Sequence, residues 1–335
     1  MRRPSRLSSA VVKLVIQIPA WDEEGQIAAA VRELPRQVPG FSKVEVLVID
    51  DGSTDATSRV AKEAGADHVL RLGIHRGLAV AWRAGLDRAL ALGADVIVST
   101  DADRQYAAQD VATLVEPILA GEAELVVGDR GVATKEDFSA GKRLMQRLGS
   151  WVVRRASGAD VPDATSGFRA MTREAALRLN VYSRMTYTTE TLIQAGNKEM
   201  AVRSVRIRTN PAVRPSRLFR SASRYVLVQA ANILRITALY KPLPVFLGLS
   251  AVFFLLGAGL FGRYAWILAT DPTPGAHIQS LILASVFLVA SLLSFLTGLL
   301  ADLISINRAL LEEILLRKRR HEASRGAEDR DDARG

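Results

Sequence analysis

The sequence predicts an α/β domain built on a doubly wound, mostly parallel sheet, followed by two membrane-spanning helices. Over about the first 210 residues, short apolar runs alternate with segments of helical periodicity, which is typical of such a sheet. After residue 242 the chain becomes almost continuously apolar. Its 335 residues, 49% of them hydrophobic, are enough for one large domain or two ordinary ones.

Five apolar runs are expected to form the strands. The first, second and fourth are apolar nearly throughout, as parallel strands buried on both faces should be. Helical spacing fills the gaps between consecutive runs, and Ser53 and Thr54 are natural caps for the second helix. Ligands of doubly wound sheets bind at the carboxyl ends of the strands, so the polar residues after these runs are site candidates. The five runs are 13–19, 43–50, 67–72, 94–100 and 123–129.

Two long uncharged runs, at about 243–262 and 278–301, predict transmembrane helices. Twenty residues at 1.5 Å each span about 30 Å, the thickness of the hydrocarbon layer. The alternative is two buried core helices, but core helices rarely run so long without a charge. Basic residues flank the pair on its outer sides, including the run 317–320, so the positive-inside rule places both termini in the cytoplasm.

Shifts in composition divide the chain into five parts. The basic N-terminus leads into only a short apolar run without a cleavage pattern, so no signal peptide is expected. Arginines mixed with apolar residues before the first span suggest amphipathic helices at the membrane surface. The parts are an N-terminal arm (1–12), the α/β domain (13–212), juxtamembrane amphipathic helices (213–241), the two spans (242–306), and a basic cytoplasmic helix with a disordered tail (307–335).

The formal net charge of +9 is compatible with binding to nucleic acid or to an anionic membrane surface. The basic residues cluster beside the apolar spans and form no recognisable nucleic-acid-binding module, so the membrane is the expected partner. The chain has no cysteine, which excludes disulfides and thiolate metal sites. The spans are also candidates for contacts in a homo-oligomer.

Carboxylates gather after three of the apolar runs, at 19–24, 50–55 and 101–105. The chain lacks G-x-G-x-x-G and G-x-x-x-x-G-K-[ST], the glycine-rich loops that cradle dinucleotides and triphosphates. Carboxylates alone would repel a diphosphate, but a divalent cation such as Mg²⁺ or Mn²⁺ would bridge the two. For Asp101 and Asp103 the alternative is that they cap the next helix, and the pair alone does not decide between these roles.

Five segments, taken in chain order, resemble the motifs of a known enzyme family. They are "IPAWDEEGQIAAAV", "EVLVIDDGSTDAT", the stretch 75–95, "STDADRQY" and "DATSGFRAM". Together they resemble family 2 inverting glycosyltransferases of the GT-A fold. The closest resemblance is to dolichol-phosphate mannose synthases and to bacterial polyprenyl-phosphate glycosyltransferases with two C-terminal transmembrane helices. It covers about residues 13–217, and the five motifs together are far more specific than any one of them.

The resemblance implies where a nucleotide-sugar donor binds. The family's P-x-Y-x-E motif lines the base and the ribose, and here a tryptophan stands in the place of the tyrosine, which stacks on a base at least as well. The second acid of "DDGS" matches a residue that contacts the nucleotide. The expected donor-binding residues are Pro19, Trp21, Glu23, Ile49, Asp51, Asp101, Ala102 and Asp103.

The family's metal-binding D-x-D motif corresponds to Asp101 and Asp103. Gln105 corresponds to the glutamine that completes the metal shell. The next four residues, usually HPPE in the family, are YAAQ here, which changes the helix start and not the ligands. The resemblance therefore implies a Mg²⁺ or Mn²⁺ ion held by these three side chains.

Arginines are expected to bind an acceptor phosphate, because the guanidinium fork suits phosphate oxygens. Arg130 matches a phosphate-binding arginine of the family, and Arg143 is the candidate for a second one, with Arg147 as its competitor. The family's basic R-x-x-G-x-S-K loop is here "NPAVRPSR", which leaves as further candidates Arg208, Arg214 and Arg217.

Glu190 falls where many family members place an acid at a helix start that acts as a base. Its alternative is a residue favoured there by the helix dipole. Residues 166–169 match the family's SGFR motif, and pairing of Arg169 with a core carboxylate such as Asp163 is the alternative to a functional role. The expected catalytic residues are Asp101, Asp103, Arg130 and Glu190.

The function implied is metal-dependent, inverting transfer of a hexose from a nucleotide sugar to a polyprenyl phosphate at the cytoplasmic membrane face. The donor would be of the GDP-mannose or UDP-glucose type, and the product a polyprenyl-phosphate sugar. One alternative is transfer to a different acceptor; a processive synthase is disfavoured because the chain is short and lacks Q-x-x-R-W. The other is a catalytically inactive lipid-binding membrane protein, which the intact D-A-D motif disfavours.

Overall fold

The computed structural model describes residues 12–131, 161–182, 186–210, 240, 242–270 and 278–332, with side chains up to residue 321. The chain separates into two compact units, one formed by Met1–Ile233 with Leu316–Gly335 and the other by Leu234–Leu315. The expected N-terminal arm, except Val12, and the expected juxtamembrane helices, except Tyr240, lie outside the described residues.

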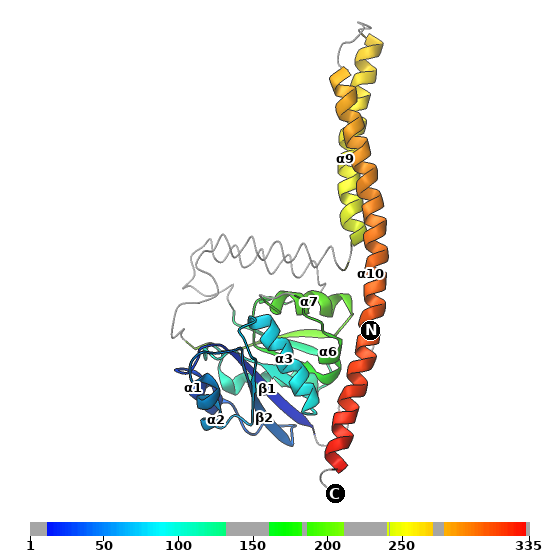
Figure 1. Cartoon of the computed structure of the whole chain (residues 1–335). Helices are drawn as coiled ribbons and strands as arrows, with labels where there is room; N and C mark the ends of the chain where they lie inside the picture. Colours follow the sequence, from blue (N-terminus) through cyan, green and yellow to red (C-terminus); the bar gives the residue numbers. More distant parts are fainter. Residues whose placement is uncertain are drawn as a thin grey trace. The chain divides into compact units, whose positions relative to one another are not determined.

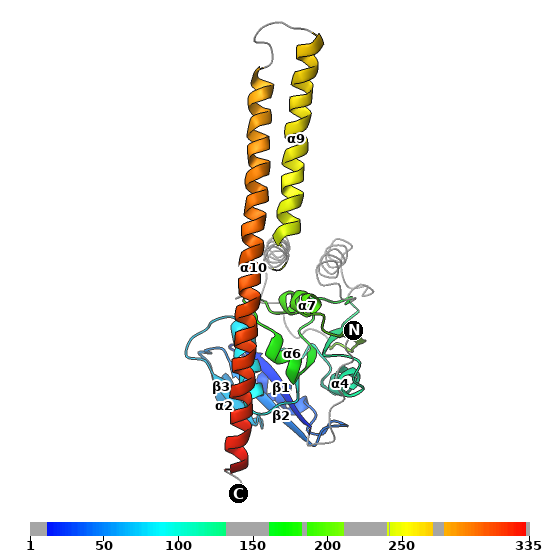
Figure 2. The ribbon, with the colours of Figure 1, turned by 90° about the vertical axis from the view of Figure 1, so that its right-hand side faces the viewer.

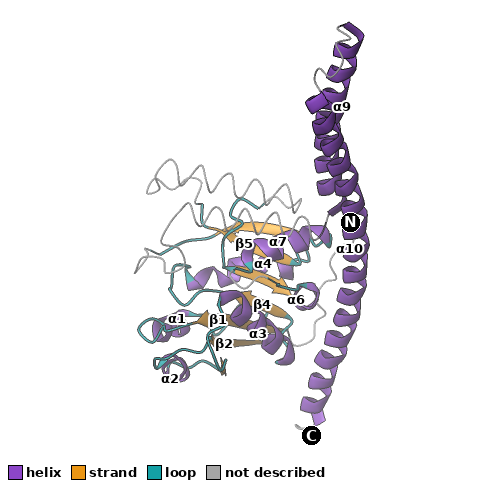
Figure 3. Ribbon diagram, turned by 45° about the horizontal axis from the view of Figure 1, so that its top comes forward, coloured by secondary structure: helices purple, strands orange, loops and turns teal. Residues whose placement is uncertain are grey.

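The first unit is built on a seven-stranded mixed sheet with the order β3-β2-β1-β4-β6-β5-β7. Figure 3 shows its strands in orange between the helices. The first four of these strands run parallel, β6 is antiparallel to both of its neighbours, and β5 pairs with β7 in parallel. The predicted α/β class with a mostly parallel sheet is therefore confirmed. The strands are β1 (Lys13–Ala20), β2 (Lys43–Asp50), β3 (His68–Arg71), β4 (Val96–Ser99), β5 (Leu125–Asp129), β6 (Arg169–Thr172) and β7 (Val202–Arg206).

Strands β6 and β7 are absent from the five predicted from the sequence. Neither β6 (RAMT) nor β7 (VRSVR) contains a continuous apolar run, and β7 lies at the edge of the sheet, where its arginines stay exposed. The helices of this unit are α1 (Ile27–Glu33), α2 (Thr57–Glu63), α3 (Leu78–Ala91), the 3₁₀ turn η1 (Ala108–Asp110), α4 (Val111–Leu119), α6 (Arg173–Arg178) and α7 (Thr188–Asn197).

The prediction that Ser53 and Thr54 cap the second helix is wrong. Helix α2 begins only at Thr57, whose backbone N–H donates to Asp55 Oδ1 at 3.0 Å. Asp55 therefore takes the capping role, as a short polar side chain ahead of a first turn commonly does. Ser53 and Thr54 instead lie in the loop after β2, where they contact the loop after β1.

Helices lie on both faces of the sheet (Figures 1 and 3), and successive side chains of the interior strand β1 point to opposite faces. Leu14, Ile16 and Ile18 join the core formed with α1, α2 and α4. Gln17 faces α3, where its Nε2 donates to Ser99 Oγ at 2.8 Å and the buried Trp82 Nε1 donates to the same oxygen at 2.9 Å. The sheet is thus covered on both faces, as its apolar strands predicted.

The second unit consists of α9 (Pro242–Thr270) and α10 (Ile278–Asp332) up to Leu315, side by side in Figure 2. Both helices are long and apolar enough to cross a membrane. Ser250 Oγ donates to the carbonyl of Ser291, and Ser291 Oγ donates back to the carbonyl of Ser250, each at 2.9 Å. Small residues at the contact and exposed large ones outside, such as Leu255 at 70% exposure, are typical of helices that meet in lipid.

The last turns of α10 belong to the first unit and contact α6. Arg319 Nη1 donates to the carbonyl of Leu179 at 3.2 Å and to Asn180 Oδ1 at 3.0 Å, just after the end of α6. Its Nη2 lies 3.4 Å from Asp87 Oδ1 on α3. The helix continues past His321 to Asp332, where the sequence predicts a disordered tail. A cation at the C-terminal end of α6 satisfies carbonyls that the helix itself leaves unpaired.

Gly85 on α3 sets how closely this helix approaches the sheet. A Cβ atom there would lie 2.4 Å from Gln17 Oε1 and 2.6 Å from Ile49 Cδ1. We expect Gly85→Ala to lower the free energy of unfolding by about 1–2 kcal/mol, because overpacking costs about 1–3 kcal/mol and the better helix propensity of alanine recovers up to about 1 kcal/mol. Thermal unfolding of the full chain in detergent measures this change. Gly25→Ala, where no atom lies within 4 Å of the new Cβ, is the matched control.

Candidate active site

The three carboxylate-rich loops meet at one edge of the sheet. β1 pairs in parallel with β2 on one side and with β4 on the other, so the carboxyl ends of all three strands lie together. Ala20 is level with Asp50, and Gln17 is level with Ser99. The loops at 19–24, 50–55 and 101–105 therefore form one site, as their positions after parallel strands predicted.

Hydrogen bonds tie the loop after β1 to the loop after β2. The backbone N–H of Asp22 donates to Ser53 Oγ at 3.0 Å, and that of Thr54 donates to Asp22 Oδ1 at 2.8 Å. Asp22 has a φ of 51°, a left-handed conformation that aspartate tolerates better than most residues. A hydrogen bond within the loop after β2 also stabilises it, because Asp50 accepts a bond from the N–H of Ser53 at 2.7 Å. Asp50 therefore supports the loop rather than facing a ligand.

Asp51 is almost completely buried, with 2% of its surface exposed. Its Oδ1 accepts a bond from the N–H of Arg76 at 2.9 Å, and its Oδ2 accepts one from the N–H of Gly77 at 2.8 Å. The same Oδ2 lies 2.9 Å from His75 Nδ1. Both carboxylate oxygens thus hold the loop that leads into α3.

Asp101 and Asp103 do not cap the following helix. Asp103 Oδ1 accepts a bond from the N–H of Gln105 at 3.1 Å, and Arg104 between them has a left-handed φ of 59°. α4 begins only after η1, with Asp110 at its N-cap position. Among the described residues, neither carboxylate accepts a bond from the first turn of α4. The capping alternative is therefore wrong, and both side chains remain at the site.

The Asp101 carboxylate packs against the backbone of Gly167. A Cβ atom at this glycine would lie 3.0 Å from Asp101 Oδ2 and 3.1 Å from the Tyr187 hydroxyl. The N–H of Gly167 donates to the Tyr106 hydroxyl at 2.9 Å, and the Tyr187 hydroxyl donates to the carbonyl of Gly167 at 3.2 Å. A side chain at position 167 would thus displace the carboxylate, which gives the glycine of the SGF segment a steric role.

Burial, together with the negative charge of Asp103, raises the pKa of Asp101 to about 7, although Arg130 and the Tyr106 hydroxyl act in the opposite direction. Two carboxylates so placed repel each other, and a cation between them would remove the repulsion. Among the described residues, no group of three His, Cys, Asp or Glu side chains could hold a metal by itself. Two carboxylates fit Mg²⁺, which proteins commonly bind through one or two carboxylates together with substrate phosphates.

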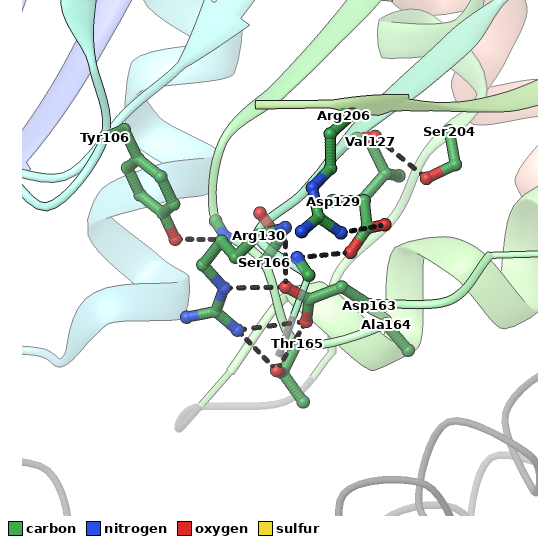
Figure 4. A network of polar contacts seen from close by, with 12 residues as sticks. Tyr106, Val127, Asp129, Arg130, Asp163, Ala164, Thr165, Ser166, Ser204 and Arg206 are labelled. Atoms are coloured by element: carbon green, nitrogen blue, oxygen red, sulfur yellow. Dashed lines mark hydrogen bonds and ion pairs between the residues drawn. The ribbon is translucent and has the colours of Figure 1, made fainter. Parts of the chain in front are cut away.

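Arg130 forms a two-point ion pair beside this site (Figure 4). Its Nε lies 2.6 Å from Asp163 Oδ2, its Nη2 lies 2.9 Å from Asp163 Oδ1, and Nη2 also donates to Thr165 Oγ1 at 2.8 Å. Burial alone would raise the pKa of Asp163, but the hydrogen bonds and the charge of Arg130 lower it. Figure 4 shows the remaining terminal nitrogen of Arg130 directed away from Asp163, and within the described part of the chain this edge of the guanidinium can still donate.

Comparisons with known proteins identify the family. The sequence profile of the glycosyl transferase family 2 matches residues 15–179. An uncharacterized protein of Methanocaldococcus jannaschii is 31% identical over 171 residues, which are 50% of this chain and 68% of that protein. This chain belongs to glycosyltransferase family 2.

Two further comparisons bear on this glycosyltransferase. It is 31% identical to the polyprenol monophosphomannose synthase of Mycolicibacterium smegmatis over 169 residues, 48% of this chain and 62% of that enzyme. The crystal structure of glucosyl-3-phosphoglycerate synthase from Mycobacterium tuberculosis with Mn²⁺, UDP-glucose and phosphoglyceric acid superimposes with a TM-score of 0.52. The match has 23% identity and covers 66% of this chain and 79% of that one, so it shows the shared GT-A fold.

Arg169 of the glycosyltransferase domain is fully buried and does not pair with Asp163, contrary to one of the alternatives from the sequence. Its guanidinium donates instead to backbone carbonyls, at 2.8 Å to Ser166, 2.7 Å to Thr188 and 2.9 Å to Ala164. Burial lowers its pKa to about 10. Asp163 forms its ion pair with Arg130 instead. Through its bonds to the backbone, Arg169 joins the SGFR segment to the start of α7.

The other predicted residues fall into three groups. Glu190 is buried in the first turn of α7, where its Oε1 accepts a bond from the N–H of Tyr182 at 2.9 Å. Arg208 donates to Asp110 Oδ1 through Nε at 2.9 Å and through Nη2 at 2.6 Å, so one edge of its guanidinium is engaged by that carboxylate. The predicted residues outside the described part of the chain are Arg143, Arg147, Arg214 and Arg217.

The donor-binding residues implied by the resemblance differ in whether their side chains are exposed to a ligand. The side chains of Ile49 and Ala102 are buried in the protein core, so contact with a ligand would involve only their backbone. Pro19 is level with Ile49 in the sheet, and Trp21 is exposed at the rim. Two residues that border the Asp101 carboxylate, Tyr106 and Tyr187, were not predicted from the sequence. The only signal for Tyr106 was its place at the start of "YAAQ", where the family usually has histidine.

The pair formed by Arg130 and Asp163 is expected to contribute strongly to stability. Asp163→Asn should lower the free energy of unfolding by about 3 kcal/mol, because it leaves a largely buried guanidinium without its charge partner. The midpoint of thermal unfolding in detergent measures the loss. In the matched control, Arg206→Gln removes an ion pair with Asp129 in which the arginine is 61% exposed, and we expect a change of at most about 1 kcal/mol. Equal losses in the two variants would contradict this account of the buried pair.

Proposed function

We propose that this family 2 glycosyltransferase transfers a hexose, with inversion, from a nucleotide sugar to a polyprenyl phosphate at the cytoplasmic face of a membrane. The observation that carries the proposal is the half-buried pair Asp101 and Asp103 after β4, which lies close enough to Arg130 for the arginine charge to act on Asp101. The name of the mycobacterial relative, a polyprenol monophosphomannose synthase, supports a lipid phosphate as acceptor.

A divalent ion, Mg²⁺ or Mn²⁺, would be held by Asp101 and Asp103, with Gln105 completing its shell. When bound, such an ion neutralises charge on the donor diphosphate as the nucleoside diphosphate leaves. The Mn²⁺ bound together with UDP-glucose in the structurally similar synthase supports a metal of this kind. Without it, burial and, to a smaller extent, the charge of Asp103 raise the pKa of Asp101.

The donor would lie along the edge formed by the ends of β1, β2 and β4. Trp21 offers an exposed aromatic face to the base, and Glu23 is expected to reach the ribose. The hydrogen bonds between the loops after β1 and β2 hold these residues before the donor arrives. A site arranged in advance loses less conformational freedom on binding and binds more tightly for it.

The acceptor phosphate would lie against the edge of the Arg130 guanidinium that is directed away from Asp163, with Arg143, Arg214 and Arg217 as further candidates. A phosphate monoester is already anionic near pH 7, so its oxygen can attack the anomeric carbon without a strong general base. Glu190 remains the candidate for that role, and its bond to the N–H of Tyr182 also supports a positioning function. The attack comes from the face opposite the leaving diphosphate, which inverts the anomeric carbon.

Helices α9 and α10 would anchor the enzyme where its lipid acceptor resides. Their exposed apolar side chains support insertion into a bilayer, and the basic residues outside the pair support cytoplasmic termini. Polyprenyl phosphates also lie in the bilayer with the phosphate at its surface. The same membrane face would then present the acceptor to the glycosyltransferase domain.

The full chain, purified in detergent, should form an organic-soluble glycolipid from one of several labelled nucleotide sugars, a polyprenyl phosphate and Mg²⁺ or Mn²⁺. Chelation with EDTA should abolish the product, and adding the metal back should restore it. Absence of a metal-dependent glycolipid from every donor tested would contradict the proposed function. A water-soluble glycoside formed with other acceptors would instead favour a different acceptor class.

Asp103→Ala should lower the rate of glycolipid formation by more than about 100-fold, because the loss of a direct metal ligand exceeds the roughly 10- to 100-fold effect of outer-shell partners. Initial rates at saturating donor and acceptor provide the measurement. Glu63→Ala removes an exposed carboxylate on α2 and should leave the rate unchanged. A normal rate in Asp103→Ala would refute the metal assignment and leave the fold intact.

A further inference from the structure

The ring of His75 covers one face of Trp21. The two ring centroids lie 4.0 Å apart with an angle of 22° between the planes, so the rings are stacked. Trp21 nevertheless remains 41% exposed, although its neighbour covers one side. At this separation no third ring fits between them, and a base that stacks on Trp21 must use the other face.

Asp51 holds His75 in this position. Its Oδ2 lies 2.9 Å from Nδ1 of the imidazole, and its two oxygens also accept bonds from the N–H groups of Arg76 and Gly77. A carboxylate with this many donors, buried at 2% exposure, has little capacity left for a ligand. The contacts of Asp51 are therefore those of a residue that shapes the loop 75–77.

Gly52 fixes the same loop from the other side. It has a φ of +69°, and a Cβ atom there would lie 2.4 Å from the carbonyl carbon of Ile74 and 2.5 Å from the N atom of His75. Only glycine allows the backbone at 74–75 to pass so closely over the end of β2. His75 is thus placed on Trp21 by a carboxylate beneath it and by a steric constraint beside it.

We propose that His75 is a positioning residue for the donor: it holds the Trp21 ring so that the nucleobase stacks on the opposite, exposed face. The proposal rests on the proposed function, because it concerns how a nucleotide sugar binds. A tryptophan whose side chain is already fixed loses little conformational freedom when the base binds. The contact between His75 and Trp21 therefore raises the affinity for the nucleotide.

Three variants separate the stacking from the hydrogen bond. His75→Phe keeps an aromatic ring on Trp21 but cannot bond to Asp51. His75→Asn keeps a nitrogen donor near the position of Nδ1 but has no ring, and His75→Ala removes both. The neighbouring Ile74→Ala, a 63% exposed side chain in the same loop, is the control for general disturbance.

The first measurement is the Kd of UDP and of GDP, each titrated calorimetrically into the full chain in detergent with Mg²⁺. We expect His75→Asn and His75→Ala to bind the preferred nucleotide about 3- to 10-fold more weakly, from the loss of one aromatic stack. The Kd values of His75→Phe and Ile74→Ala should stay within about twofold of the wild-type value. Equal affinity in all variants, or loss in His75→Phe with retention in His75→Asn, would overturn the proposal.

The second measurement is the split between KM and kcat. A residue that only positions Trp21 for the base should raise the donor KM by the same factor as the Kd and leave kcat within about twofold, as for lost uniform binding. A fall in kcat without a change in KM would overturn the positioning role. If the wild-type chain binds neither UDP nor GDP, the proposed function is refuted as well. If it binds one of them and the Kd is the same in every variant at position 75, only this inference is refuted.

Discussion

Repulsion between Asp101 and Asp103, held together at the half-buried end of β4, is the constraint on which the rest of the site depends. Their surroundings contain the carboxylate of Asp163 and the guanidinium groups of Arg130 and Arg169. The cluster therefore carries one more carboxylate than guanidinium. Because Asp163 neutralises Arg130 and backbone carbonyls hold Arg169, neither arginine forms an ion pair with the Asp101 and Asp103 carboxylates. The pair is left with an excess of negative charge that suits a divalent cation.

Gly167 makes this arrangement sterically possible. The turn that contains it leads into β6, the strand inserted antiparallel between β4 and β5, and its backbone lies against the Asp101 carboxylate. Tyr106 and Tyr187 hold the N–H and the carbonyl of the same residue. Burial raises the pKa values of both tyrosines, so their hydroxyls keep their protons and remain donors beside the carboxylate.

Local features of the sequence predicted the parallel strands, the loops that follow them and the Asp101–Asp103 pair, because strand burial and strand-end position are encoded within a few residues. The contacts between residues far apart in the sequence were not predictable in this way. Asp163 meets Arg130 and not Arg169 because β6 inserts between β4 and β5, a pairing between segments far apart in the sequence. The helix start at Thr57 was missed for a related reason, since Ser53 bonds to a loop more than thirty residues away. The intrinsic preference of serine favoured a helix cap at Ser53, but the contact with the loop after β1 determined the role of this side chain.

The surroundings of Glu190 show how a buried acid can affect a site without contacting a substrate. Its Oε1 accepts from Tyr182 N, while Gln194 on the next turn of α7 bonds to the backbone of Asn180. Arg319, from the last part of α10, donates to the side chain of the same Asn180. The connector 179–182 is therefore held between α7 and a cation that lies just beyond the end of α6. Since Tyr187, directly before α7, bonds to Gly167, a shift of this connector would move the residue against which Asp101 packs. A contribution of Glu190 to the rate can thus arise from the position of α7. The proposed acceptor, a phosphate that is already anionic, does not need Glu190 as a general base.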